Sequence, residues 1–327
     1  MNLYWRLAQG ASVATALGVV ALLVFREDLG LFLTWHVLVP LVPLSLLLAP
    51  QVWRNLCPIA VVHQLPVHLR FGGTRRVPVR VQRTAPAVAA ALFYAIVPLR
   101  LTVFDVSGPA LAAFVVAVLA VAFVGAVLVT GKGGWCATFC PVLPVERLYG
   151  QHPVIDAPHA HCDDCTGCIR SCYDLKPERS MDELVRGRRG RSGVLRRPMG
   201  FFAAAFPGFV LGYFTAGEAG VAGAYAWILA HAAASALVVA AVQRATGASD
   251  RVAVRVPAAV AAGLYYWFVV PSIAAAAREV LSAAPPAGAV RVAQVACLAV
   301  AAFWFLDIGR RVRLQGAGRI RRPHQQA

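Results

Sequence analysis

Eight long apolar stretches constrain the fold of this chain more than any other feature of its 327 residues. A helix needs roughly 20 predominantly apolar residues to cross a bilayer. The composition agrees, because 59% of the residues are hydrophobic and 14% are charged, against about 25% charged in soluble proteins. We therefore expect an all-α integral membrane protein with transmembrane helices at about 9–25, 30–50, 85–104, 109–130, 199–217, 220–243, 256–277 and 290–306.

The Lys and Arg residues predict the orientation of these helices. With eight crossings, 27 of the 31 basic residues fall on the side that holds both termini. Basic loops of inner-membrane proteins face the cytoplasm, so we expect a multi-pass protein of the bacterial inner membrane with both termini cytoplasmic. The net charge of +16 is explained by this topology and does not call for a nucleic-acid partner.

The same arrangement divides the chain into three regions. Residues 1–130 form a four-helix membrane region that includes a Cys-Pro loop, and residues 131–198 form a cytoplasmic loop. Residues 199–327 form a second four-helix membrane region with a basic tail. The lipid membrane is therefore the first expected partner of the chain.

The cytoplasmic loop contains the sequence HCDDCTGCIRSC over residues 161–172. Its thiols have the spacing C-x2-C-x2-C-x3-C, which is typical of 4Fe-4S ligands in bacterial ferredoxins. Zinc sites more often use paired C-x2-C units separated by a dozen or more residues. Clustered thiols on the reducing side of a membrane more often bind metal than form disulfides. We therefore expect a small ferredoxin-like iron-sulfur loop with the ligands Cys162, Cys165, Cys168 and Cys172.

The fourth ligand of this cluster has two candidates. In two-cluster ferredoxins the last cysteine of such a run binds the other cluster, and a Cys-Pro from elsewhere completes the first. Here Cys172 is followed by Tyr173, whereas Cys57 and Cys140 precede prolines. Either all four cysteines of the run bind the cluster, or Cys140 replaces Cys172. Beyond the run, Cys57, Cys136 and Cys140 are candidate additional ligands, but they are too few for a second all-cysteine cluster.

Two histidines, His36 and His231, fall inside predicted transmembrane helices. Ionisable groups are costly at such positions, which makes a functional role the first hypothesis. The pair could ligate a haem, and either imidazole could hydrogen-bond a quinone headgroup. The alternative is that both make hydrogen bonds that pack one helix against another.

The two Cys-Pro sequences belong to a weak internal repeat. The first copy reads WRNLCPI over residues 53–59, and the second reads CATFCPV over residues 136–142. The second copy, together with the downstream cysteine run, resembles the polytopic iron-sulfur proteins of the NapH, NosR and FixG type over about residues 30–175. In that family, C-x3-C-P motifs end transmembrane helices on the cytoplasmic side, and ferredoxin-like cysteines follow.

The resemblance implies a role in quinol oxidation, in electron delivery to reductases or in metalloenzyme maturation. Cys136 and Cys140 match one C-x3-C-P motif, and the run 162–172 matches one ferredoxin motif. The chain departs from the family because Trp53 replaces the partner of Cys57, a second ferredoxin run is absent and four more helices follow. These departures indicate a divergent relative, in which quinol oxidation through two clusters is not expected.

The leading functional hypothesis is a membrane protein that passes single electrons through one 4Fe-4S cluster at the cytoplasmic face. Its exchange partners would be the quinone pool or a ferredoxin on one side and a partner reductase on the other. Such a chain would serve as a quinol dehydrogenase-like electron-transfer subunit. The alternative hypothesis is an accessory protein that senses redox state or assists the assembly of a metalloenzyme.

Overall fold

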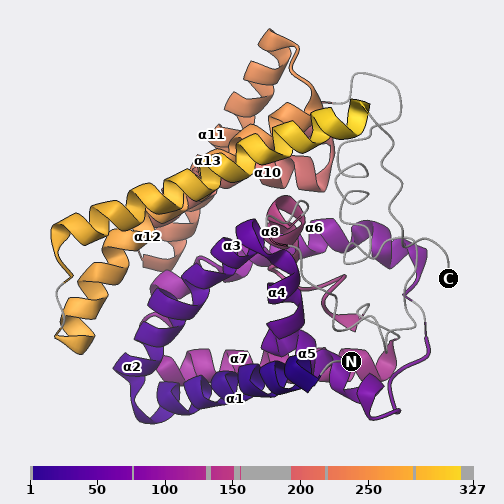
Figure 1. The fold of residues 1–327 in the computed structure, drawn as a ribbon, viewed down its shortest axis with the longest axis vertical. Helices are drawn as coiled ribbons and strands as arrows, with labels where there is room; N and C mark the ends of the chain where they lie inside the picture. Colours follow the sequence, from indigo (N-terminus) through magenta and orange to yellow (C-terminus); the bar gives the residue numbers. More distant parts are fainter. Residues whose placement is uncertain are drawn as a thin grey trace.

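The computed structural model describes residues 3–75, 77–129, 134–150, 155, 193–217, 220–282 and 285–317. These ranges are mainly helical, and their β-structure is an isolated bridge between Arg75 and Val129. The helices, labelled as in Figure 1, are α1 (Leu3–Phe25), α2 (Glu27–Phe32), the π-helix η1 (Leu33–Leu38), α3 (Val39–Leu48), α4 (Pro50–Leu56), α5 (Pro58–His68), α6 (Val79–Ile96), the π-helix η2 (Arg100–Phe104), α7 (Gly108–Leu128), α8 (Leu143–Tyr149), the 3₁₀-helix η4 (Val194–Arg196), α10 (Pro198–Thr215), α11 (Gly220–Thr246), α12 (Asp250–Leu281) and α13 (Ala287–Ala317).

Eight helical segments within the described ranges are long and apolar enough to cross a membrane. The expectation of an all-α, multi-pass membrane protein is confirmed at this level, by length and composition. Each segment overlaps one of the predicted stretches. The segments are Leu3–Phe25, Glu27–Leu48, Arg80–Phe104, Gly108–Leu128, Pro198–Thr215, Gly220–Thr246, Asp250–Leu281 and Ala287–Leu306.

Helix α10 lies at the centre of the C-terminal half, packed against α11 and α12 (Figure 1). Of its span, 67% is buried, whereas no other candidate span in the described ranges exceeds 28%. Gly208 and Gly212 allow α11 to approach closely, because a Cβ at Gly208 would overlap the carbonyl oxygen of His231. Small residues four apart commonly allow membrane helices to pack backbone against backbone. The glycines therefore account for the close contact between α10 and α11.

In the N-terminal half, α1 and α7 lie side by side (Figure 1). At one end of this pair, Gly108 packs against the carbonyl oxygen of Leu23. At the other end, the short helix α5 packs against both α1 and α7. The α5 side chains of His63 and Gln64 are 0% and 2% exposed. The chain after Cys57 is therefore part of the helix bundle, and we call this end of the bundle the cysteine end.

Helix α8 connects the two halves of the molecule. The Tyr149 hydroxyl donates a hydrogen bond to the carbonyl oxygen of Ala258 in α12, at 2.7 Å. The indole Nε1 of Trp304 in α13 donates to the carbonyl oxygen of Tyr149 at 3.2 Å. Both aromatic side chains are at most 2% exposed, and their ring centroids lie 5.3 Å apart. These contacts fix α8, and with it the chain that follows Cys140, against the C-terminal helices.

Candidate functional site

Cys57 lies at a break between α4 and α5. The proline that follows it has no N–H, so the helix cannot continue with full hydrogen bonding. The last carbonyl groups of α4 therefore need other donors. Gln9 Nε2 donates to the carbonyl oxygen of Asn55 at 3.3 Å, and Ser12 Oγ donates to that of Leu56. Two polar side chains of α1 thus hold the backbone directly before Cys57.

Cys140 lies at the end of a compact turn. Its backbone N–H donates to the carbonyl oxygen of Trp135 at 3.2 Å, and its own carbonyl accepts from the N–H of Leu143 at 3.0 Å. The turn packs closely on α7, because a Cβ at Gly134 would overlap the carbonyl oxygen of Gly125. Hydrogen bonds on both sides and this glycine contact fix the backbone of Cys140.

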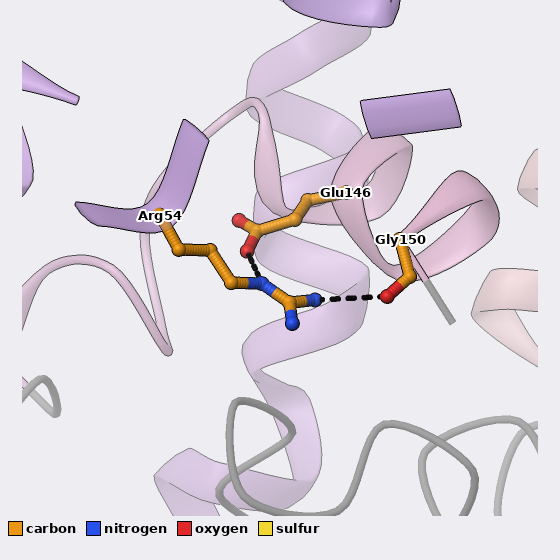
Figure 2. Close-up of polar contacts among 3 residues, drawn as sticks. All are labelled: Arg54, Glu146 and Gly150. Carbon is orange, nitrogen blue, oxygen red and sulfur yellow. Dashed lines mark hydrogen bonds and ion pairs between the residues drawn. The ribbon is translucent and has the colours of Figure 1, made fainter. Parts of the chain in front are cut away.

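A buried ion pair joins the two Cys-Pro segments. Arg54, which precedes Cys57, places its Nε 2.5 Å from Oε1 of Glu146, which follows Cys140. Nη2 of the same guanidinium donates to the carbonyl oxygen of Gly150 at 3.2 Å, as Figure 2 shows. The side chains of Arg54 and Glu146 are 4% and 12% exposed. Neither charge is stable at such burial without its partner, so the pair holds α4 against α8.

The thiol of Cys140 lies in surroundings that oppose its ionisation. Burial raises its pKa well above that of an ordinary cysteine, and the nearby Cys57 and Glu146 raise it further. Hydrogen bonds from the N–H groups of Val142 and Leu143 act in the opposite direction and do not cancel the shift. Cys57 is thus near enough to Cys140 to act on it electrostatically. A thiol of this kind becomes a thiolate when a metal cation compensates its charge.

Some of the predicted metal ligands lie within the described residues, and the others do not. Cys57 is near enough to Cys140 to act on it electrostatically, and Cys136 lies in the turn that leads to Cys140. The run 162–172, with Cys162, Cys165, Cys168 and Cys172, lies outside the described residues. Among the residues that are described, no group of three or more His, Cys, Asp or Glu side chains could hold a metal ion. Soft thiols such as those of Cys57 and Cys140 are ligands that iron-sulfur clusters use, but ligation by these residues stays a prediction.

His36 belongs to a polar cluster at the end of the bundle opposite the cysteine end. It lies in η1, and Arg100 lies in η2; π-helical turns are rare and frequently occur at functional sites. Arg100, Asp105 and Glu279 are near enough to act electrostatically on His36. The Arg100 guanidinium lies 4.7 Å from the centroid of the Trp35 ring, and its Nη2 lies 3.8 Å from Asp105 Oδ2. His36 itself stacks on the Phe32 ring, with the ring centroids 5.6 Å apart.

His231 lies in different surroundings, on α11. Its Nδ1 lies 2.9 Å from the carbonyl oxygen of Trp227, one turn earlier, and the two rings are 4.4 Å apart. Its backbone packs against Gly208 of α10. These contacts account for one ring nitrogen and agree with a helix-packing role. Contact of His36 or His231 with a haem or a quinone stays a prediction.

Comparisons of the chain with models of known protein families, with curated protein sequences and with solved structures found no match. The resemblance to proteins of the NapH, NosR and FixG type therefore rests on the Cys-Pro motifs and the cysteine run. It stays a prediction.

Arg54 and Glu146 are site residues that the sequence reasoning missed. Arg54 is one of many basic residues on the predicted cytoplasmic side, and its partner lies 92 positions away. One signal was available in the sequence. Glu146 is the acidic residue nearest to Cys140 in the sequence and follows it by six positions, so a cationic partner near the second Cys-Pro motif could have been expected.

Proposed function

We propose that this protein transfers single electrons through a 4Fe-4S cluster at the cytoplasmic face of a bacterial inner membrane. The ligands would be Cys162, Cys165, Cys168 and Cys172, with Cys140 as the competitor for the fourth position. Such a cluster supplies a one-electron carrier whose potential depends on net charge, hydrogen bonds and solvent exposure. The C-x2-C-x2-C-x3-C spacing carries the proposal.

The surroundings of Cys140 support this proposal. Ligands of a metal centre need a supporting shell of contacts that holds them in place. Around Cys140, that shell consists of the Arg54–Glu146 ion pair and the hydrogen bond from Tyr149 to α12. A cysteine with so many fixed neighbours loses little further freedom when it becomes a ligand.

The length of α7 bears on where an electron-transfer partner would bind. Helix α7 has 21 residues, which at about 1.5 Å per residue is roughly 31 Å. The polar cluster around His36 lies near the beginning of α7, and Cys140 follows its end. Electron tunnelling decays exponentially with distance, so exchange with a quinone, a ferredoxin or a partner reductase would take place at the cysteine end.

Metal analysis of the anaerobically purified chain tests the proposal. We expect about four iron and four acid-labile sulfide per chain and an EPR signal that changes on reduction with dithionite. Cys172→Ser and Cys140→Ser should differ in iron content, and the variant that loses iron identifies the fourth ligand. Cys297→Ser, in α13, is the matched control and should retain all iron. Zinc in place of iron, or no bound metal, would refute the proposal.

The alternative role, redox sensing or metalloenzyme assembly, is favoured by one observation. The chain has one ferredoxin run and Trp53 in place of a further cysteine. These residues provide for one cluster, so no second cluster is expected to carry the electron onward within the chain. Stopped-flow and steady-state measurements with a quinol analogue and an electron acceptor separate the two roles. Continuous turnover supports electron transfer, whereas reduction that stops after one electron per chain supports sensing.

A further inference from the structure

A cavity of about 760 Å³ opens at the cysteine end of the C-terminal helices. Its walls are η4, the last turns of α11 and the turn that leads from α11 into α12. Gly247 in this turn has a φ of +66°, the left-handed conformation with which glycine commonly ends a helix. Because the candidate spans of α10 and α12 begin here and that of α11 ends here, the cavity lies at the boundary of the membrane-spanning region.

Gln243 holds the walls of the cavity together. Its Oε1 accepts a hydrogen bond from the backbone N–H of Val194 at 2.9 Å. Its Nε2 donates to Oδ1 of Asp250 at 2.6 Å and to the carbonyl oxygen of Ala248 at 3.4 Å. The amide thus ties η4 to the start of α12. It also engages one carboxylate oxygen of Asp250, the acidic residue of the lining.

The electrostatic character of the cavity is positive. Arg196 and Arg244 line it, and both side chains are exposed. The N-terminus of α12, a helix of 32 residues, adds the positive end of its dipole. Arg251 and Arg255 follow in the first two turns of that helix. These groups outweigh the single carboxylate of Asp250 and favour an anionic ligand.

The cavity also has an apolar side. Val194, Leu195 and Ala240 contribute to its lining. Leu237, one turn before Ala240 on the same face of α11, is 66% exposed. A ligand that fits the cavity therefore has an anionic head at the level of the arginines and an apolar part that continues along α11 toward the membrane interior.

We infer that the cavity binds the headgroup of an anionic phospholipid. The guanidinium groups of Arg196 and Arg244 contact the phosphate, because arginine forms charge-assisted and bidentate hydrogen bonds with phosphate oxygens. The acyl chains lie along α11 beside Leu237. Basic pockets between membrane helices on the cytoplasmic side are suited to anionic lipids. The inference is independent of the iron-sulfur proposal, since no cysteine takes part in it.

Native mass spectrometry of the delipidated full chain in nonionic detergent tests the inference. Dioleoylphosphatidylglycerol and dioleoylphosphatidylcholine are titrated separately. We expect saturable binding of the anionic lipid and about tenfold weaker binding in the double variant Arg196→Gln/Arg244→Gln. Arg244→Lys keeps the charge without the planar fork and should bind with intermediate affinity. The matched control is Arg26→Gln/Arg291→Gln, which removes two exposed arginines at the opposite end and should leave the affinity unchanged.

Four results would overturn the inference. Equal binding of the two lipids would show that the headgroup charge is not recognised. An equal loss of affinity in the control variant would show non-specific attraction to a basic protein. Inorganic phosphate that displaces the anionic lipid at similar concentration would assign the cavity to free phosphate. An acidic peptide that displaces it in the same way would assign the cavity to a protein partner.

Discussion

Replacement of either member of the Arg54–Glu146 pair should destabilise the protein strongly, and replacement of both should not. With side chains 4% and 12% exposed, the remaining charge in a single variant is left buried without its partner. That situation typically costs about 3–5 kcal/mol. Arg54→Met and Glu146→Leu should each lower the free energy of unfolding by this amount.

The double variant Arg54→Met/Glu146→Leu removes both charges of this ion pair. Apolar replacement of a buried ion pair is often neutral or stabilising, but the Gly150 carbonyl loses a donor 3.2 Å away. A lost hydrogen bond of this kind costs about 1–3 kcal/mol. We therefore expect the double variant to be destabilised by about 0–2 kcal/mol. The single variants then sum to several kcal/mol more than the double variant.

Equilibrium unfolding in mixed micelles of dodecyl maltoside and sodium dodecyl sulfate, followed by tryptophan fluorescence, measures these differences. Asp28→Asn is the control, because Asp28 is exposed in the first turn of α2 and its charge contributes at most about 1 kcal/mol. The reasoning is refuted if both single variants unfold within about 1 kcal/mol of the unaltered chain. It is refuted equally if the double variant is as unstable as the sum of the two.

Three further predictions concern packing and protonation. Gly208→Ala should lower the free energy of unfolding by about 1–3 kcal/mol, because the added Cβ would overlap a carbonyl oxygen of α11. Gly18→Ala is the control and should not destabilise the protein, because the space at that position is open. Equal effects of the two substitutions in the same unfolding assay would contradict the packing argument. Tyr149→Phe should cost about 1 kcal/mol for its lost hydrogen bond to α12, and Tyr4→Phe, 79% exposed, should cost nothing. The raised pKa of Cys140 keeps its thiol protonated near pH 8.5, where an ordinary thiol ionises. Maleimide labelling of Cys140 in the metal-free chain should therefore rise at higher pH than labelling of the same residue in the detergent-unfolded chain. Coincident labelling profiles would show that the pKa of Cys140 is not raised.

The positions of the candidate spanning helices could be predicted because hydropathy and helix-capping residues depend on residues that are close together in the sequence. The stretch 109–130 is an example, since Gly108–Leu128 is helical and Ser107 caps it by accepting a hydrogen bond from the N–H of Ala110. Helix α5 gave no such signal. Its 11 residues are too few for a span and include the polar residues His63 and Gln64, which are buried in a helix that packs against α1 and α7.

The contacts between the two Cys-Pro segments could not be predicted for a different reason. The charge pattern predicts a side of the membrane for Arg54, but it does not predict which of the 15 acidic residues forms the ion pair with it. That choice depends on how α4 and α8 pack. The sequence pattern therefore predicted the candidate cysteines, whereas the groups that hold them in place emerged only from the tertiary structure.

The residues at corresponding positions of the predicted internal repeat account for the Arg54–Glu146 ion pair between the described Cys-Pro segments. Corresponding positions in the two copies, counted from the cysteine before proline, carry different residues. They are Trp53 and Cys136 four residues before it, Arg54 and Ala137 three residues before it, and His63 and Glu146 six residues after it. Arginine occurs in the first copy and the carboxylate in the second, so a single Arg–Glu contact forms across the pair. The first copy supplies the supporting cation, and the second supplies the additional thiol.

In this proposal the Arg54–Glu146 pair holds the backbone in place, whereas the cysteines bind the cluster. The double variant Arg54→Met/Glu146→Leu tests whether these two roles are separate. Neither side chain is a proposed ligand, so the variant keeps every cysteine. If the pair only stabilises the fold, a folded double variant should retain its iron. If the pair also positions Cys140, the folded double variant should lose iron to the same extent as Cys140→Ser. Because the unfolding assay measures folding separately, iron loss in a stable double variant would show that α4 and α8 must be held together for Cys140 to reach the cluster.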